Sequence, residues 1–303
     1  MRPARPASSR PYSCPRRSRR RGRSPEPPSR PSLAQVTPQV ESGSRVATRP
    51  AISRSHGALR AHDRQRPHGI RHRRVKLATR RRRIALPGGG GVSAVVALPS
   101  GSRPGRSPAI ILAHGAGGDM TNPFVSTIHT GLAREGYIAV KFNFPYAEAR
   151  RRAPDPRPVL ERCYRAVLDA VAQDRTLAPS WIAIGGKSLG GRIASYLAAG
   201  GAPVHALLLL GYPLHPAGKP EQLRADHLPA VPVPTLFIQG TRDALCDMDR
   251  LRPLLGRLPH ASLHTIDGGD HSFRLPRRAE RPDSEVWSAI VAVAARWLRS
   301  VRG

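Results

Sequence analysis

From about residue 82 to the end of the chain, short apolar runs alternate with longer segments of helical periodicity. Two of the runs, 109–113 and 206–210, are apolar throughout, as expected of strands buried on both faces of a sheet. The segments between the runs place apolar residues three or four positions apart, which predicts helices. This alternation predicts an α/β fold of about eight mostly parallel strands with helices on both faces.

Turn and capping residues set the boundaries of these elements. Four glycines at 88–91 separate the first two strand-like runs and predict a hairpin. A helix begins at Pro123 with Thr121 or Asn122 as its cap, and Gly136 ends it. The other predicted strands are 83–87, 92–98, 137–142, 181–184, 235–239 and 262–266, and the other predicted helices are 159–171, 193–199, 249–258 and 284–301.

One predicted strand–helix junction carries a Gly-x-Ser-x-Gly motif centred on Ser188. Gly186 and Gly190 lack side chains, so strand and helix approach closely at a turn that holds the serine in a strained conformation. This is the sequence form of a nucleophile elbow, with the serine hydroxyl at the carboxyl edge of the sheet. A phosphate-binding loop would need a glycine where Trp181 stands, so that alternative fails. A glycine-rich turn without chemistry remains the other interpretation.

A serine hydroxyl needs a general base, and the base needs an orienting acid. Asp243 follows the strand 235–239, and His271 follows the last strand, in a loop loosened by two glycines. Both positions lie at the edge of the sheet that carries Ser188. Asp247 and Asp249 are alternative acids, although acidic residues are ordinary at the start of a helix.

Backbone amides are the expected donors to a developing oxyanion. The N–H of Leu189 follows the nucleophile, and the glycine-rich loop after the strand 109–113 offers Ala116. His114 leads this loop, and we expect it to support the turn. Asp270, beside His271, is expected to be solvated or a minor electrostatic partner.

Together these residues resemble the α/β-hydrolase superfamily and, within it, the small dienelactone-hydrolase-like group. The resemblance covers about residues 82–303. It implies an α/β-hydrolase fold with Ser188 as nucleophile, Asp243 as acid and His271 as base. The chain departs from true dienelactone hydrolases in having serine rather than cysteine at the elbow. The segments that carry the resemblance are 112–117, 142–146, 185–192, 211–216, 239–243 and 269–273.

The segment 211–234 is too short for a large lid domain and holds six prolines. We therefore expect an open, shallow pocket. Its candidate walls are aromatic or apolar, with two cations as candidate anion contacts, although loop packing and solvated charge are the ordinary roles of such residues. The candidates are Phe144, Tyr146, Tyr212, Leu214, Lys187 and Arg192.

Most of the formal net charge of +30 lies before this domain. Residues 1–83 hold 24 Lys and Arg against three acids, a net charge of +21. Residues 1–80 show no apolar periodicity, so we predict a disordered Arg/Pro/Ser-rich tail. A solvated tail is the first interpretation. The alternatives are a non-specific nucleic-acid arm, a transit peptide, and a start assigned too far upstream, with the true start near Val75.

The chain has no signal-peptide core and no apolar run long enough to cross a membrane. Its three cysteines have unrelated spacings, which indicates a reducing, cytoplasmic setting without disulfides or a metal site. We expect no cofactor. The sequence thus predicts a serine hydrolase of small ester or lactone-like substrates. The alternatives are a non-catalytic module of the same fold and nucleic-acid association through the tail.

Overall fold

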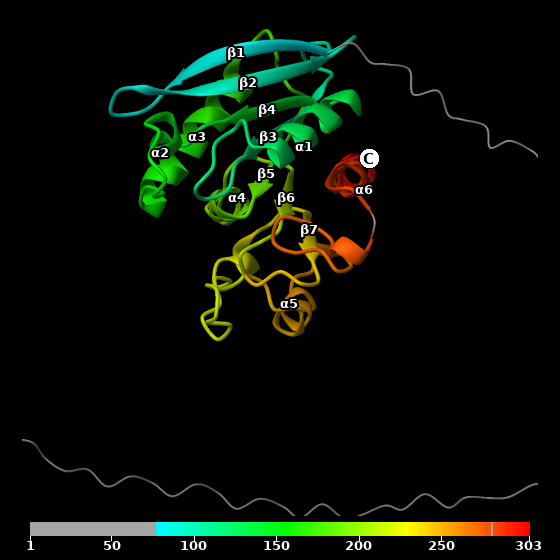
Figure 1. Cartoon of the computed structure of the whole chain (residues 1–303). Coiled ribbons are helices and arrows are strands. Elements are labelled where there is room, and N and C mark those ends of the chain that lie inside the picture. The colour runs from blue at the N-terminus through cyan, green and yellow to red at the C-terminus, as the bar shows by residue number, and fades with distance from the viewer. Residues whose placement is uncertain (1–76, 280) are drawn as a thin grey trace, which may run out of the picture. The chain divides into compact units, whose positions relative to one another are not determined.

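A single eight-stranded sheet organises the chain, in the order β1-β2-β4-β3-β5-β6-β7-β8 (Figure 1). The computed structural model describes residues 77–279 and 281–303. β2 runs opposite to the other seven strands, because it pairs antiparallel with both β1 and β4 while the other pairs are parallel. The strands are β1 (Leu77–Ala85), β2 (Gly91–Pro99), β3 (Pro108–Ala113), β4 (Ile138–Phe142), β5 (Trp181–Lys187), β6 (Ala206–Leu210), β7 (Thr235–Gly240) and β8 (Ala261–Ile266).

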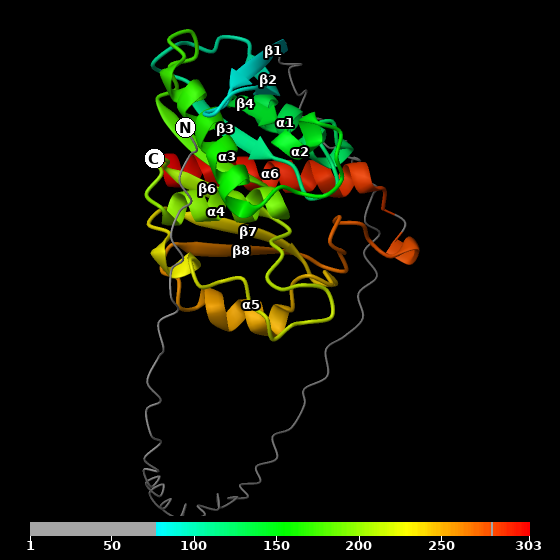
Figure 2. The same cartoon turned by 90° about the vertical axis from the view of Figure 1, so that its left-hand side faces the viewer.

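Helices cover both faces of this sheet (Figures 1 and 2). On one face lie α1 (Pro123–Arg134) and α6 (Asp283–Arg302), which pack against each other and against the sheet. The other face carries α2 (Pro145–Glu148), α3 (Arg157–Gln173), α4 (Leu189–Ala199) and α5 (Met248–Leu255). The central strands β3 and β6 are buried along their whole length, as expected from their unbroken apolar character. The predicted fold class is confirmed.

The predicted boundary of the folded region is wrong at its start. The first strand begins at Leu77, so residues 77–80 belong to the sheet and not to the tail. The strand is the edge of the sheet, and its four consecutive arginines, 80–83, are exposed. Charged side chains on an exposed edge strand produce no apolar pattern. The rest of the predicted disordered tail lies outside the described residues.

The helix at α1 begins and is capped as predicted, since the side chain of Asn122 accepts hydrogen bonds from the N–H groups of Phe124 and Val125. The short helix α2 was not predicted. The helix α5 ends at Leu255, earlier than the predicted 258. Between β6 and β7 the chain forms one short 3-10 helix, Leu228–Ala230, and within the described residues this segment builds no lid domain, as predicted.

The parallel strands β3, β5, β7 and β8 end at the same edge of the sheet. Because these strands are parallel, the loops that follow them lie together at that edge. Within residues 77–279 and 281–303, no helix has the length and apolar character needed to cross a membrane.

Candidate active site

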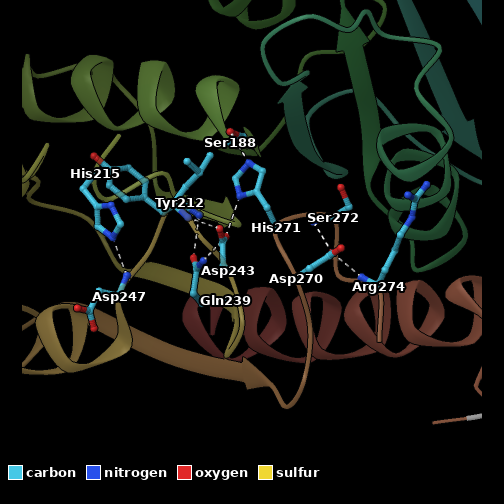
Figure 3. Close-up of polar contacts among 11 residues, drawn as sticks. Ser188, Tyr212, His215, Gln239, Asp243, Asp247, Asp270, His271, Ser272 and Arg274 are labelled. Carbon is cyan, nitrogen blue, oxygen red and sulfur yellow. Dashed lines mark hydrogen bonds and ion pairs between the residues drawn. The ribbon is translucent and has the colours of Figure 1, made fainter. Parts of the chain in front are cut away.

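Three side chains from three loops meet at the carboxyl edge of the sheet. The imidazole of His271 lies between Ser188 and Asp243 (Figure 3). Its Nε2 is 2.9 Å from Ser188 Oγ and its Nδ1 is 2.8 Å from Asp243 Oδ2. With Nδ1 protonated, the ring donates to the carboxylate and accepts from the serine hydroxyl, which is the arrangement of a nucleophile, a base and an orienting acid.

The carboxylate of Asp243 is held by more than the histidine. Its side chain has no exposed surface. Gln239 Nε2 donates to Asp243 Oδ2 at 2.6 Å, and the N–H of Leu245 donates to Oδ1 at 2.8 Å. A buried carboxylate is stable only when hydrogen bonds replace lost hydration, so these donors compensate for its burial and fix its orientation. Sequence reasoning missed Gln239, which lies near the end of β7, four residues before the acid.

Asp247, one of the two alternative acids, and Asp270, the expected minor electrostatic partner, have other partners. Asp247 caps α5, where its side chain accepts from the N–H of Asp249 at 2.9 Å. Asp270 accepts hydrogen bonds from the N–H groups of Ser272 and Arg274. Both carboxylates therefore close local turns, and in the described contacts neither reaches the imidazole of His271 (Figure 3).

The backbone of Ser188 is strained, with φ of 51° and ψ of −115°. A non-glycine residue rarely adopts a positive φ, and such strain collects at functional sites. The turn requires glycine two positions later, since a Cβ on Gly190 would lie 2.4 Å from the carbonyl oxygen of Ala113. The close approach of α4 to β3 therefore holds Ser188 at the apex of the turn, where its exposed fraction is 9%.

The loops that carry the acid and the base are joined to each other. The N–H of Arg242 donates to the carbonyl of Gly269 at 2.9 Å, and the N–H of Gly268 donates to Thr241 Oγ1 at 2.8 Å. The two loops therefore position Asp243 and His271 as one unit.

The predicted oxyanion donors lie beside the serine. Leu189 is the first residue of α4, where a backbone N–H has no partner inside its own helix. The N–H of Ala116 makes no hydrogen bond to any described residue. Both residues line one cavity with Ser188.

His114 supports the loop of Ala116 as expected. Its Nε2 accepts from the N–H of Phe144 at 3.1 Å, and its Nδ1 lies 2.8 Å from the carbonyl oxygen of Gly115. Burial lowers the pKa of His114, so the neutral ring is favoured, as this pattern of contacts requires. Its role is structural.

The structure does not place the predicted pocket walls in the cavity. Phe144, Tyr146 and Tyr212 are fully buried. Tyr146 donates to the carbonyl of Gly115 at 3.1 Å, and Tyr212 donates to the carbonyl of Arg224 at 2.7 Å. Loop packing explains them. Leu214 is likewise buried and lies outside the cavity lining.

The prediction that Lys187 contacts an anion in the pocket is not met either, because Lys187 does not line the cavity. Its Nζ is buried and has no hydrogen-bond partner among the described residues, and it lies 5.6 Å from the centre of the Phe273 ring. A Cβ on Gly211 would lie 2.8 Å from this Nζ. The ammonium of Lys187 therefore occupies space that is free because residue 211 is a glycine.

The cavity at Ser188 has a volume of about 270 Å³. Of the predicted contacts it contains Ser188, Leu189, Ala116 and Arg192. Sequence analysis did not predict the other lining residues. They lie in loops and at helix starts, and no local sequence pattern indicates how these segments pack. They include Arg157, Arg224, Asp155, Pro213 and Leu245.

A second serine–histidine pair joins α4 to the segment between β6 and β7. Ser195 Oγ is 2.7 Å from His227 Nε2 and donates to the carbonyl of Arg192 at 2.7 Å. Ser195 is fully buried, and within the described residues no carboxylate bonds to His227. Burial lowers the pKa of His227 to about 4, with Arg157 and Arg192 adding to the shift. Because no carboxylate orients His227 and the serine is buried, we interpret this pair as a packing contact between α4 and the loop after β6.

The architecture has close counterparts among solved structures. A dienelactone hydrolase from Anabaena variabilis is 20% identical, with a TM-score of 0.59 over 74% of this chain and 98% of that one. A lidless α/β serine hydrolase from Xanthomonas campestris is 22% identical, with a TM-score of 0.55 over 72% and 94%. An α/β serine hydrolase homologue from Coxiella burnetii is 20% identical, with a TM-score of 0.53 over 63% and 88%. At these identities the likeness establishes the fold.

The family follows from the sequence itself. Residues 106–299 match the family described as "Alpha/beta hydrolase domain". This match spans more than half of the chain and includes all three residues that meet at the sheet edge. The chain therefore belongs to the α/β-hydrolase family.

Proposed function

We propose that the protein is a serine hydrolase that cleaves small carboxylic esters or lactones. The observation that carries the proposal is the continuous hydrogen-bonded series Ser188–His271–Asp243, with 2.9 Å and 2.8 Å between successive partners. The strained backbone of Ser188 and the family match support the same chemistry.

The proposed reaction has two halves. Ser188 Oγ attacks the ester carbonyl carbon while its proton passes to His271 Nε2. The tetrahedral oxyanion is stabilised by the N–H groups of Leu189 and Ala116. The carbon–oxygen bond of the alcohol then breaks, and the alcohol leaves with the proton from His271. Water attacks the acyl-serine, again through His271, and releases the acid and free serine. Asp243 holds the tautomer throughout.

A fluorophosphonate probe tests the proposal directly, because it reacts only with an activated serine. The intact protein should be labelled at Ser188 and should hydrolyse a short-chain aryl ester. We expect Ser188→Ala to lose labelling and to lower kcat/KM by at least about a thousandfold.

Ser195→Ala is the matched control, since it removes the serine of the other serine–histidine pair. This variant should still be labelled at Ser188. Hydrolysis that persists in Ser188→Ala at the level of the intact protein would falsify the proposal.

A further inference from the structure

The cavity beside Ser188 is rich in positive charge. Three guanidinium groups line it, from Arg157, Arg192 and Arg224. They come from the start of α3, the first turn of α4 and the loop after β6. The one acid in the lining is Asp155; its Oδ1 is paired with Arg151 outside the lining, and its Oδ2 is buried without a hydrogen-bond partner among the described residues.

Arg192 sits where a cation is unfavourable. It occupies the first turn of α4, and the positive end of a helix dipole repels a positive side chain. Its Nε is buried and has no hydrogen-bond partner among residues 77–279 and 281–303. Within the same residues it forms no ion pair with a carboxylate. No described hydrogen bond or ion pair compensates for the burial of this Nε.

Arg224 faces the same cavity from the opposite loop, and its backbone is fixed at both ends of the residue. Its N–H donates to the carbonyl of Leu214 at 2.7 Å, and its carbonyl accepts from the hydroxyl of Tyr212 at 2.7 Å. Burial and the positive charge of Arg192 lower the pKa of Arg224. Its guanidinium, too, has no carboxylate partner in the described part of the chain.

Arg157 is engaged elsewhere. Its guanidinium lies over the ring of Tyr196, 4.5 Å from the ring centre, and its Nε is 3.4 Å from Glu161 Oε1. Arg192 and Arg224 therefore remain as two like charges that repel each other across the cavity. An anion between them would relieve this repulsion and satisfy the buried Nε.

We propose that the ester cleaved at Ser188 carries an anionic group, a carboxylate or a phosphate, bound by Arg192 and Arg224. This inference rests on the proposed function of Ser188. The lining of the same cavity also includes Ile193, Pro213 and Leu245, which suit a short apolar spacer. A cavity of about 270 Å³ accommodates a small substrate of this type.

Two substrate pairs test the proposal, each with an anionic and a neutral member. Monomethyl glutarate and dimethyl glutarate form the carboxylate pair, and 2-acetoxyethyl phosphate and 2-acetoxyethyl acetate form the phosphate pair. We expect kcat/KM to favour the anionic member at least about tenfold in one pair, and that pair identifies the anion.

Variants of the two arginines test whether Arg192 and Arg224 cause the preference for the anionic substrate. Arg192→Gln and Arg224→Gln should each reduce the anionic-to-neutral ratio about tenfold or more. Arg257→Gln is the matched control, because Arg257 is exposed before the start of β8, at the opposite edge of the sheet. It should keep the ratio of the intact protein. High salt should weaken the preference, whereas raising the pH to 9.5 should not, because guanidinium stays charged.

A neutral member preferred in both pairs, or a ratio unmoved by both arginine variants, would overturn the inference. Ligand binding to the Ser188→Ala protein tests the anion site independently of the proposed catalytic function. Calorimetric binding of monomethyl glutarate or 2-acetoxyethyl phosphate that is lost in Arg224→Gln supports the anion site even if Ser188 proves inactive. Hydrolysis of the neutral esters without such binding rejects the anion site alone.

Discussion

At the scale of single residues, the buried Lys187 beside Ser188 lowers the stability of the folded protein. Burial lowers the pKa of its ammonium from 10.5 to about 8, because the negative charges of Asp243 and Asp270 offset only part of the lost hydration. The unfolded chain therefore binds this proton more tightly than the folded protein does. The resulting penalty is complete below about pH 8 and disappears as the pH rises towards 10.5.

We therefore expect Lys187→Met to stabilise the protein at pH 7 by about 2–3 kcal/mol. The gain should shrink as the pH approaches 10.5. Urea unfolding of both proteins at pH 7 and pH 10 measures it. Lys219→Met is the control, since Lys219 is exposed, and it should change the unfolding free energy by less than about 0.5 kcal/mol. A gain of equal size at both pH values would contradict this explanation.

At the scale of elements, α1 is joined to the sheet by a buried histidine. His129 Nε2 lies 3.0 Å from the carbonyl oxygen of Ala139 on β4 and 3.2 Å from that of Val95 on β2. Burial, helped by the charge of Lys141, lowers its pKa to about 4. Because the folded pKa lies below the ordinary 6.5, the stability that comes from keeping this ring neutral is complete above pH 6.5. It is lost as the pH falls towards 4.

His129 alone should thus remove about 3 kcal/mol of unfolding free energy between pH 6.5 and pH 4. His129→Gln keeps an N–H donor but does not titrate. Between pH 6.5 and pH 4 we therefore expect its unfolding free energy to fall by about 3 kcal/mol less than that of the intact protein. Denaturant unfolding at both pH values gives the difference. His260→Gln, at an exposed position, should retain the full pH dependence, and an equal loss in all three proteins would show that other groups cause it.

At the scale of the whole molecule, β1 closes one side of the sheet. It pairs with β2 from Leu77 opposite Pro99 to Ala85 opposite Gly91, and Arg83 forms an ion pair with Glu148 of α2 at 2.6 Å. Its exposed arginines discourage a second sheet from adding to this edge. Without β1, β2 would become an edge strand with unpaired backbone groups and far less charge.

A chain that starts at Leu77 should therefore be more stable than one that starts at Leu86. We expect the shorter chain to unfold at least about 5 °C lower, since each kcal/mol shifts Tm by about 2–4 °C at this size, and to aggregate more readily. Thermal unfolding and light scattering compare the two. Equal melting temperatures would mean that β1 contributes little to the fold.

The fold was predictable because its signals are local and repeat along the chain. The apolar runs at β3 and β6 identify buried strands, and the motif around Ser188, with Asp243 and His271 after later strands, defines three points on one edge. The structure brings these three together, while their catalytic roles remain a prediction that the labelling experiment tests.

The errors share a physical origin. The arginines of β1 resemble a solvated tail because an edge strand needs no apolar face. Phe144, Tyr146 and Tyr212 follow strand ends, where an aromatic side chain packs inward or lines a pocket according to contacts distant in sequence. Arg224 was missed for the same reason, since its direction depends on how the loop after β6 docks on Tyr212.

The hydrogen bonds between the loops 241–243 and 267–271 have a consequence for anyone who recombines this protein with its relatives. The N–H of Arg242 donates to the carbonyl of Gly269, and the N–H of Gly268 donates to Thr241 Oγ1. Each loop therefore stabilises the conformation of the other. A chimera that takes only one of these loops from a relative would lose the match between the hydrogen-bonding groups of the two loops. The two segments should be exchanged together, as a single cassette.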